Sequence, residues 1–283
     1  MAFETANKKS SKKQAAVCDD RKIRLYMDMA FKQNMACPLN GDQTHYLRRV
    51  MRCAKGDQIL VFNGRDGEWQ AEIETLSKKQ ARLFLRHQTR PQTNLPDLWL
   101  IFALIKNARI DFIIQKATEM GVAKLLPIIT KRTQGGRHRR VNLARLHANA
   151  VEAAEQCGLL QVPEITAPQN LIGLLNQWES VAPARQIVFC DESAHKGAGL
   201  DGLAKLKGKP VALLIGPEGG FDEAERDQLL ARRDVCRISL GPRILRTDTA
   251  AIAGLVACQM LFGDWQESES ANESESANES KGQ

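Results

Sequence analysis

The chain has 283 residues, of which 43% are hydrophobic and 26% are charged. This length and composition are typical of a globular protein with a hydrophobic core and room for two domains. No apolar stretch approaches the length of a membrane span, and no apolar segment follows the lysines near the N-terminus. The sequence therefore argues against a membrane protein and against a secretory signal peptide.

The cysteine and histidine pattern gives no sign of a disulfide framework or a metal site. The seven cysteines lie far apart without a C-x-x-C pair, and the five histidines lack metal-ligand spacing. We therefore expect buried, reduced thiols in a cytoplasmic protein, and no metal.

The two ends of the chain are predicted to be disordered. Residues 1–21 form a polar, lysine-rich arm, and residues 265–283 form an acidic tail with a repeat of Glu, Ser, Ala and Asn. The net charge is +7; five Glu and one Lys from Gln266 onward contribute −4, which leaves +11 for the rest. A basic body favours a polyanionic partner such as nucleic acid, although 5% aromatic residues give no sign of a base-stacking platform.

Residues 22–92 predict a small β-rich domain of barrel type. Short strand-like runs recur there, and the Asn-Gly-Arg-Asp-Gly sequence at residues 63–67 is strong turn chemistry. One or two helical turns are expected between Thr44 and Arg52, and the proline-bracketed segment 91–96 is expected to be a linker.

Residues 97–264 predict an α/β domain. Strands are expected at residues 98–105, 124–129, 186–190 and 211–215, and helices are expected near residues 110–117 and 143–157. This alternation is typical of a mostly parallel sheet with helices on both faces.

Two glycine-containing loops follow short strands near the C-terminal end. The first is IGPEGGF at residues 215–221, followed by Asp222 and Glu225 in the spacing of a helix cap; the second is LGPRILRTDTA at residues 240–250. Exposed backbone groups in two such loops can bind one small ligand between neighbouring strand ends. The glycines can equally serve only to form tight turns, and the loops match neither the dinucleotide-binding nor the Walker fingerprint.

These two strings resemble the signature of the ribosomal RNA small subunit methyltransferase E family, within the SPOUT superfamily. Further resemblances follow the family order: HYLRRVMR at residues 45–52, Gly-Asp at 56–57, QKATEMGV at 115–122 and EAAEQCG at 152–158. The resemblance covers roughly residues 22–263. It implies an enzyme that methylates N3 of one uridine in 16S rRNA of the 30S subunit, with S-adenosyl-L-methionine (SAM) as methyl donor.

The resemblance also implies an architecture. Residues 22–92 would form a PUA-like RNA-binding β-barrel, and residues 97–264 would form a SPOUT methyltransferase domain with a deep trefoil knot. Knots are almost absent from proteins, so composition alone does not predict one. Enzymes of this kind are homodimers, which assemble through the knotted domain.

The site residues carried over from the family fall into two groups. Those expected to bind the cofactor are Leu214, Gly216, Glu218, Gly219, Gly220, Leu240, Gly241, Leu245 and Arg246. Because N3 of neutral uracil carries a proton, methyl transfer requires its loss or stabilisation of the resulting anion. Arg246 is the first candidate for stabilising that anion, and Glu155 is a weaker candidate for the proton acceptor.

Basic side chains are the candidates for RNA contact, with solvated surface charge as the alternative. They are Arg24, Arg48, Arg49, Arg52, Lys116, Arg132, Arg137, Arg139 and Arg140. One departure from the family is Leu159, where many members have Arg; if that Arg contacts RNA, a residue such as Arg132 must substitute or the contact is absent.

Two alternative functions remain open at this stage. One is a methyltransferase of the same superfamily that acts on tRNA or 23S rRNA. The other is a non-catalytic RNA-binding or ribosome-assembly factor, against which the intact loops argue.

Overall fold

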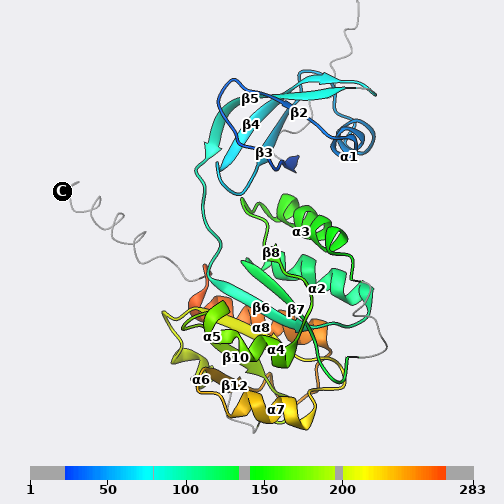
Figure 1. Ribbon diagram of the computed structural model, residues 1–283. Helices are drawn as coiled ribbons and strands as arrows, with labels where there is room; N and C mark the ends of the chain where they lie inside the picture. The colour runs from blue at the N-terminus through cyan, green and yellow to red at the C-terminus, as the bar shows by residue number, and fades with distance from the viewer. Residues whose placement is uncertain (1–22, 79, 134–140, 195–199, 266–283) are drawn as a thin grey trace, which may run out of the picture. The chain divides into compact units, whose positions relative to one another are not determined.

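Residue contacts divide the computed structural model into two units, Met1–Gln92 and Thr93–Gln283. The structure describes residues 23–78, 80–133, 141–194 and 200–265 (Figure 1). The predicted disordered arm lies outside these residues, as does the predicted tail from residue 266 onward.

The first unit is built on one five-stranded sheet, in the order β1-β3-β4-β5-β2. The strands are β1 (Arg24–Tyr26), β2 (Ala36–Pro38), β3 (Gln58–Phe62), β4 (Glu68–Leu76) and β5 (Ala81–Arg90). The β1–β3 pair is parallel and the other pairs are antiparallel. Among the described residues no pairing joins β1 to β2, so the predicted closed barrel is not confirmed. Each of these edge strands has only three residues and offers few backbone groups for closing the sheet.

The predicted helical turns and the predicted Asn-Gly turn are both present in this unit. A capping box between Asn40 and Gln43 starts α1 (Gly41–His45), which continues into a short π-helix, η1 (Tyr46–Val50). In the predicted turn between β3 and β4, the side-chain oxygen of Asn63 accepts hydrogen bonds from the backbone N–H groups of Arg65 and Asp66 at 2.9 and 2.8 Å.

The second unit contains the predicted parallel sheet, and every strand pair in it is parallel. The strands are β6 (Leu98–Ala103), β7 (Lys124–Ile129), β8 (Glu164–Ile165), β9 (Gln169–Asn170), β10 (Gln186–Cys190), β11 (Val211–Ile215) and β12 (Val235–Ile238). Their order is β12-β10-β11-β6-β7-β8, with β9 also paired to β7. The strands that precede the two glycine-containing loops, β11 and β12, therefore lie on either side of β10.

Helices cover both faces of this sheet, which confirms the predicted α/β class. They are α2 (Asn107–Glu119), α3 (Leu143–Cys157), α4 (Leu171–Asn176), α5 (Trp178–Val181), α6 (Leu200–Ala204), α7 (Glu223–Leu230) and α8 (Thr247–Phe262). One hydrophobic cluster joins the sheet to α2, α3, α6 and α8, and a second joins it to α4, α5 and α7 (Figure 1).

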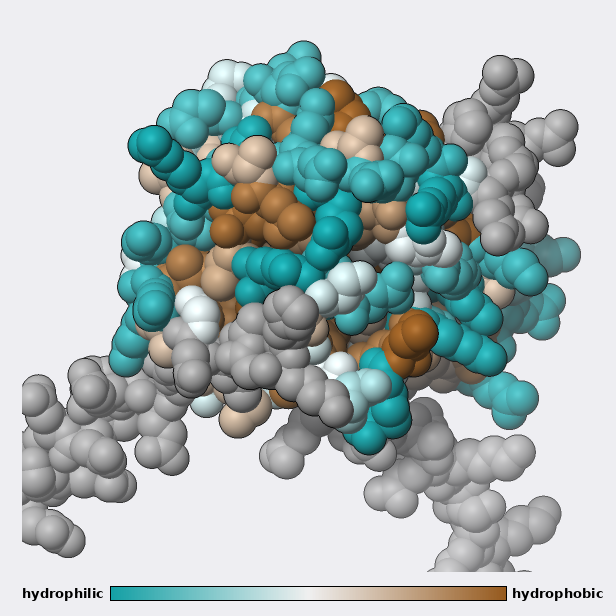
Figure 2. All heavy atoms as spheres, turned by 90° about the horizontal axis from the view of Figure 1, so that it is seen from below, coloured by the Kyte–Doolittle hydropathy of each residue, from teal (hydrophilic) through white to brown (hydrophobic). Residues whose placement is uncertain are grey.

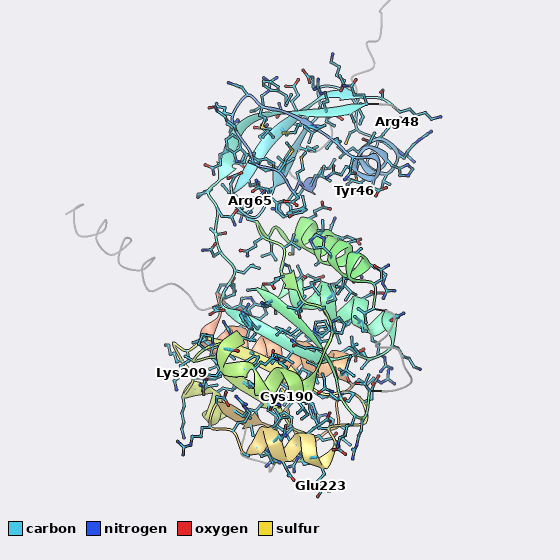
Figure 3. The ribbon with its side chains drawn as sticks, in the orientation of Figure 1. Tyr46, Arg48, Arg65, Cys190, Lys209 and Glu223 are labelled. Atoms are coloured by element: carbon cyan, nitrogen blue, oxygen red, sulfur yellow. The ribbon has the colours of Figure 1, made fainter. Side chains whose placement is uncertain are left out.

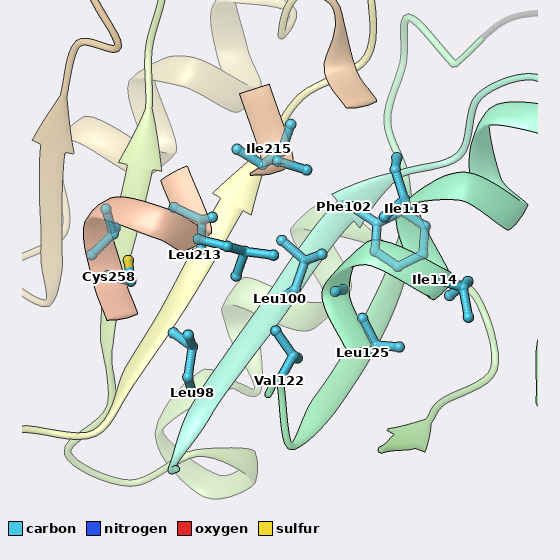
Figure 4. Packing of buried hydrophobic residues seen from close by; sticks show 14 of the residues in the cluster. Leu98, Leu100, Phe102, Ile113, Ile114, Val122, Leu125, Leu213, Ile215 and Cys258 are labelled. Atoms are coloured by element: carbon cyan, nitrogen blue, oxygen red, sulfur yellow. The ribbon is translucent and has the colours of Figure 1, made fainter. Parts of the chain in front are cut away.

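The first of these clusters holds α8 against the strand that precedes the first loop. In this cluster Cys258 of α8 lies on the side of Leu213 of β11, and Ile113 of α2 lies beside Phe102 of β6 (Figure 4). A Cβ atom on Gly254 of α8 would lie 2.8 Å from Cδ2 of Leu213, so glycine allows the helix to approach β11 closely.

On the face shown in Figure 2, small hydrophobic patches lie between hydrophilic side chains. No helix in the described part of the chain has the length and apolar character needed to cross a membrane.

Among the described cysteines, burial predicts very different reactivities. Cys157 is exposed, whereas Cys258 is fully buried and burial raises the pKa of its thiol to about 12. Since the thiolate is the nucleophile, we expect iodoacetamide at about pH 8 to alkylate Cys157 in the folded protein and Cys258 only after denaturation. Peptide mass spectrometry at successive times checks this; equal labelling rates in the folded protein would contradict it.

Candidate functional site

The two predicted loops line one pocket at the carboxyl ends of β10, β11 and β12. Six of the predicted cofactor residues contribute to its wall: Gly216, Glu218, Gly220, Leu240, Gly241 and Leu245. Parallel strands end at the same edge of a sheet, which is why segments about 25 residues apart in sequence meet here.

A third loop, which the sequence analysis did not select, completes the pocket. Asp191, Glu192 and Ser193 follow β10 and lie in the wall beside the two predicted loops. The available signal was polar: two acidic residues and a serine directly follow an apolar strand, as in many ligand-binding edges of α/β sheets. Figure 3 labels Cys190, the last residue of β10 before this loop.

The first loop depends on small residues. A Cβ atom on Gly216 would lie 2.6 Å from the ring of Phe221, and that ring packs edge-on against Phe189 with 5.2 Å between centroids. Gly220 has a φ of +68°, and a Cβ atom there would lie 3.0 Å from Oε1 of Glu192. The glycines therefore keep the backbone close to the pocket, where its N–H and C=O groups can contact a ligand.

Direct contacts hold the first loop against the start of α8. The Thr247 hydroxyl donates a hydrogen bond to the Gly216 carbonyl oxygen at 3.1 Å. Arg109 of α2 lies 3.0 Å from Glu218 and 3.9 Å from Asp248 through its guanidinium nitrogens. Arg109 thus links Glu218 of the first loop to the first turn of α8. Arg109 was not predicted, because no local pattern links α2 to the loops, whereas Thr247 belongs to the second predicted loop.

Two basic residues directly after β7, Lys131 and Arg132, form hydrogen bonds with the first loop and the residue that follows it. The Arg132 guanidinium donates to the Gly219 carbonyl oxygen at 2.8 Å, and Nζ of Lys131 donates to Oδ1 of Asp222 at 2.7 Å. The hydrogen bond from Lys131 lowers the pKa of the Asp222 carboxyl, and the same contact raises the pKa of Lys131. Asp222 and Glu225 also form the predicted capping box of α7. Arg132, predicted to contact RNA, therefore lies at the pocket.

Other predicted residues lie elsewhere. Leu214 is fully buried in β11, between β10 and β6, and does not line the pocket. Gly219 is not a wall residue either, although its carbonyl oxygen accepts the hydrogen bond from Arg132. Arg246 is exposed and directly precedes α8 as its N-cap. Glu155 is half-buried on α3, and none of the described residues of α3 lines the pocket. Since α3 packs on α2 and not at the strand ends, the structure does not bring Glu155 to the predicted site.

The pocket suits a charged, nucleoside-like ligand. Its wall combines glycine backbone, the apolar side chains of Leu240 and Leu245, and charged groups of both signs that include Glu218 and Arg132. Such a wall can contact a flat base, a cationic centre and an amino-acid end at once. SAM has these three parts, so the residues present fit the cofactor that the sequence implies. No group of three or more potential metal ligands occurs in the described residues.

Comparison with known proteins decides the family. An RNA methyltransferase domain model matches residues 91–259, and an RNA methyltransferase PUA domain model matches residues 39–85. A Synechocystis protein named ribosomal RNA small subunit methyltransferase E is 31% identical over 225 residues, which are 79% of this chain and 72% of the relative. The chain belongs to the ribosomal RNA small subunit methyltransferase E family. The family prediction made from the sequence is thus confirmed, and so is a PUA-like domain in the first unit.

Other members of the family resemble the chain over nearly their whole length. The Rickettsia conorii protein of that name is 29% identical over 246 residues, 86% of this chain and 98% of the relative. A crystal structure of the Neisseria gonorrhoeae ribosomal RNA small subunit methyltransferase E bound to SAM has a TM-score of 0.74 and 26% identity. It covers 86% of this chain and 99% of its own.

Of the four arginines in the PUA-like unit that were predicted to contact RNA, one is buried and three are more accessible. Arg49 and Arg52 are exposed and Arg48 is half-buried, all on η1 or just after it (Figure 3). Arg24 is only 8% exposed and its guanidinium lies 2.8 Å from the buried carboxylate of Glu68. The prediction that Arg24 contacts RNA is therefore corrected: its side chain faces the interior.

Of the remaining candidates for RNA contact, Lys116 lies on α2 with its Nζ 2.7 Å from Glu119. Arg137, Arg139 and Arg140 lie outside the described residues.

Replacing Arg24 by alanine is expected to lower the free energy of unfolding of the first unit by about 3 kcal/mol, because Glu68 then keeps a buried charge with a weaker partner. Arg90 also lies beside that carboxylate, with a guanidinium nitrogen 3.7 Å from it. Thermal or urea unfolding of the full chain checks this. An unchanged unfolding transition combined with weakened RNA binding would contradict it and restore Arg24 as an RNA contact.

Proposed function

We propose that the chain transfers a methyl group from SAM to N3 of one uridine in 16S rRNA of the small ribosomal subunit. The observation that carries this proposal is the meeting of the two family loops in one pocket, joined by the hydrogen bond from Thr247 to Gly216. Family membership and the SAM bound to the Neisseria gonorrhoeae relative support the same cofactor here.

The proposed cofactor site comprises the predicted loop residues. They are Leu214, Gly216, Glu218, Gly219, Gly220, Leu240, Gly241, Leu245 and Arg246. The glycine backbone would bind the adenine edge, and the two leucines would cover its face. Bound SAM supplies an electrophilic methyl group on a positively charged sulfur, and the carboxylates of Glu218 and Glu192 favour that charge near the wall.

Arg246 is the proposed catalytic residue. It stands exposed at the N-terminus of α8, where the helix dipole adds to the positive potential of its guanidinium. Both favour the uracil anion, whose charge spreads over N3, O2 and O4 once the N3 proton has passed to water; N3 would then take the methyl group and S-adenosylhomocysteine would leave. Arg246 thus lowers the cost of the proton loss that methylation at N3 requires.

The two units take different parts in this proposal. Residues 22–92 would bind RNA through Arg48, Arg49 and Arg52, and residues 97–264 would bind the cofactor and carry out the chemistry. Arg132 would contact RNA near the cofactor, and Arg137, Arg139 and Arg140 are further proposed RNA contacts. Such phosphate contacts make affinity fall with salt concentration.

The proposed assembly is a cytoplasmic homodimer of knotted domains that acts on the 30S subunit. Residues 252, 253, 256 and 257 of α8 are apolar and half-buried, and Met260 is 63% exposed. α8 packs on β11, α2 and α6, and the apolar side chains that this packing leaves half-buried or exposed support a partner that covers them. The trefoil knot and the closed barrel are implied by the resemblance and remain predictions.

The test is methyl transfer from labelled SAM to 30S subunits from cells that lack this activity, with the product nucleoside identified by mass spectrometry. We expect N3-methyluridine in 16S rRNA, and no label in subunits that are already methylated. Label in tRNA or 23S rRNA alone would contradict the substrate. Absence of SAM binding would favour the non-catalytic alternative.

A further inference from the structure

Asp191 lies in the pocket wall and is bound to two arginines from different elements. Its side chain is 4% exposed, and its Oδ2 atom lies 3.1 Å from a terminal nitrogen of Arg226 and 2.6 Å from Nε of Arg237. The Oδ1 atom accepts a hydrogen bond from the Ser193 backbone N–H at 2.9 Å. Oδ2 is thus surrounded by guanidinium nitrogens and Oδ1 accepts a backbone N–H, so protein groups fix the position of this carboxylate.

The two arginines belong to the elements that carry the cofactor loops. Arg226 is on α7, the helix that directly follows the first loop, and Arg237 is on β12, the strand that leads into the second loop. Asp191 itself follows β10, which lies between β11 and β12 in the sheet. One carboxylate thus joins the element after one loop to the element before the other.

We propose that Asp191 is a positioning residue that holds the two cofactor loops in register through Arg226 and Arg237. This inference rests on the proposed function and adds a residue outside the two family loops. Among the described residues no other carboxylate is paired with either guanidinium. Removing the negative charge would leave two adjacent cations, Arg226 in the pocket wall and Arg237 next to it, and their repulsion would move α7 and β12 apart.

We expect the loss of Asp191 to change the affinity for SAM and not the rate of the chemical step. Because Asp191 shapes the pocket before SAM binds, its loss weakens the binding of SAM equally in the ground state and in the transition state. A residue that acted in the chemical step would instead lower kcat at saturating SAM. The split between KM and kcat therefore separates positioning from chemistry.

The first variant is Asp191→Asn in the full-length protein, which preserves side-chain size and removes the charge. We expect the Kd for labelled SAM, measured by equilibrium dialysis, to rise by about tenfold or more. The KM for SAM should rise in parallel, while kcat on 30S subunits at saturating SAM stays within about threefold of wild type. Asp191→Glu, which restores the charge on a longer side chain, should recover part of the affinity.

Asp234→Asn is the matched control. Asp234 pairs with Arg232 at 2.9 and 2.6 Å in the same unit, and it is not among the described residues that line the pocket. Its Kd for SAM should stay within about twofold of wild type. An equal loss of affinity in Asp234→Asn would show general destabilisation and overturn the proposal, as would a folded Asp191→Asn protein with wild-type Kd.

If Asp191→Asn does not fold, Arg226→Lys and Arg237→Lys take its place, because lysine keeps the charge and loses the planar hydrogen-bonding geometry. We expect each to raise the Kd by about threefold or more; wild-type Kd values in both would overturn the proposal. Failure of the wild-type protein to bind SAM would remove the proposed function itself. Wild-type binding with unaffected variants would remove only the role of Asp191.

Discussion

Gly216→Ala is expected to weaken SAM binding by about tenfold to a hundredfold. The new Cβ atom would lie 2.6 Å from the Phe221 ring, which is held in place by Phe189 behind it. Relieving such a contact in a packed site costs about 1–3 kcal/mol, and each 1.4 kcal/mol changes Kd by about a factor of ten. Equilibrium dialysis with labelled SAM measures the change.

Gly173→Ala provides the control for this substitution. Gly173 lies inside α4, and a Cβ atom there would have open space. Alanine in a helix is favoured over glycine by about 0.5–1 kcal/mol, so the control should keep its SAM affinity and gain a little stability. Wild-type affinity in Gly216→Ala would show that the Phe221 ring yields, and that this face of the first loop does not bind SAM.

Arg246→Ala is expected to lower the single-turnover rate of methylation by about a hundredfold with saturating SAM and saturating 30S subunits. Removal of one group that stabilises a developing anion typically has an effect of about 10²–10³ on rate. Rapid quenching with labelled SAM measures the rate. Arg246→Lys, which retains a positive charge without the planar guanidinium, should have a rate between those of the wild type and Arg246→Ala.

The rate in Arg246→Ala is decisive for the catalytic assignment. A full single-turnover rate would remove Arg246 from the chemical step, even if SAM binding were weaker. Arg243→Ala separates the two arginines of the same loop: Arg243 lines the pocket, and it does not stand at the N-terminus of α8. We therefore expect Arg243→Ala to weaken SAM binding more than it lowers the single-turnover rate of methylation.

The sequence predicted those parts of the site that are continuous along the chain. The two glycine-containing loops, the capping box at Asp222 and the alternation of strands and helices all depend on residues a few positions apart. Local backbone conformation and short-range hydrogen bonds determine such features, so their signals survive in a linear pattern.

The missed parts depend on the order of the strands. Because β10 lies between β11 and β12, the Asp191 loop becomes the third wall of the pocket, and Arg237 reaches its carboxylate across 46 residues of sequence. Arg109 reaches Glu218 across 109 residues for the same kind of reason. Charged residues so far apart carry no mutual signal in a single sequence.

Arg24 shows the converse error. An arginine in a short strand of a basic domain resembles a surface residue that contacts RNA. In the structure, however, Glu68 on β4 accepts a hydrogen bond from the Arg24 guanidinium, and the Phe62 ring centroid lies 4.6 Å from Cζ of Arg24. The strand pattern gives the direction of a side chain only when the paired strand is known. Burial of an ion pair between two strands therefore could not be read from residues 22–92 alone.

A crystal structure of the chain with S-adenosylhomocysteine tests the central claim most directly. The account predicts ligand density between residues 216–221 and 239–247, with the Asp191 carboxylate still bound to Arg226 and Arg237 behind it. Density at another place in the chain would contradict the account, and so would a pocket that stays free of ligand at a saturating concentration.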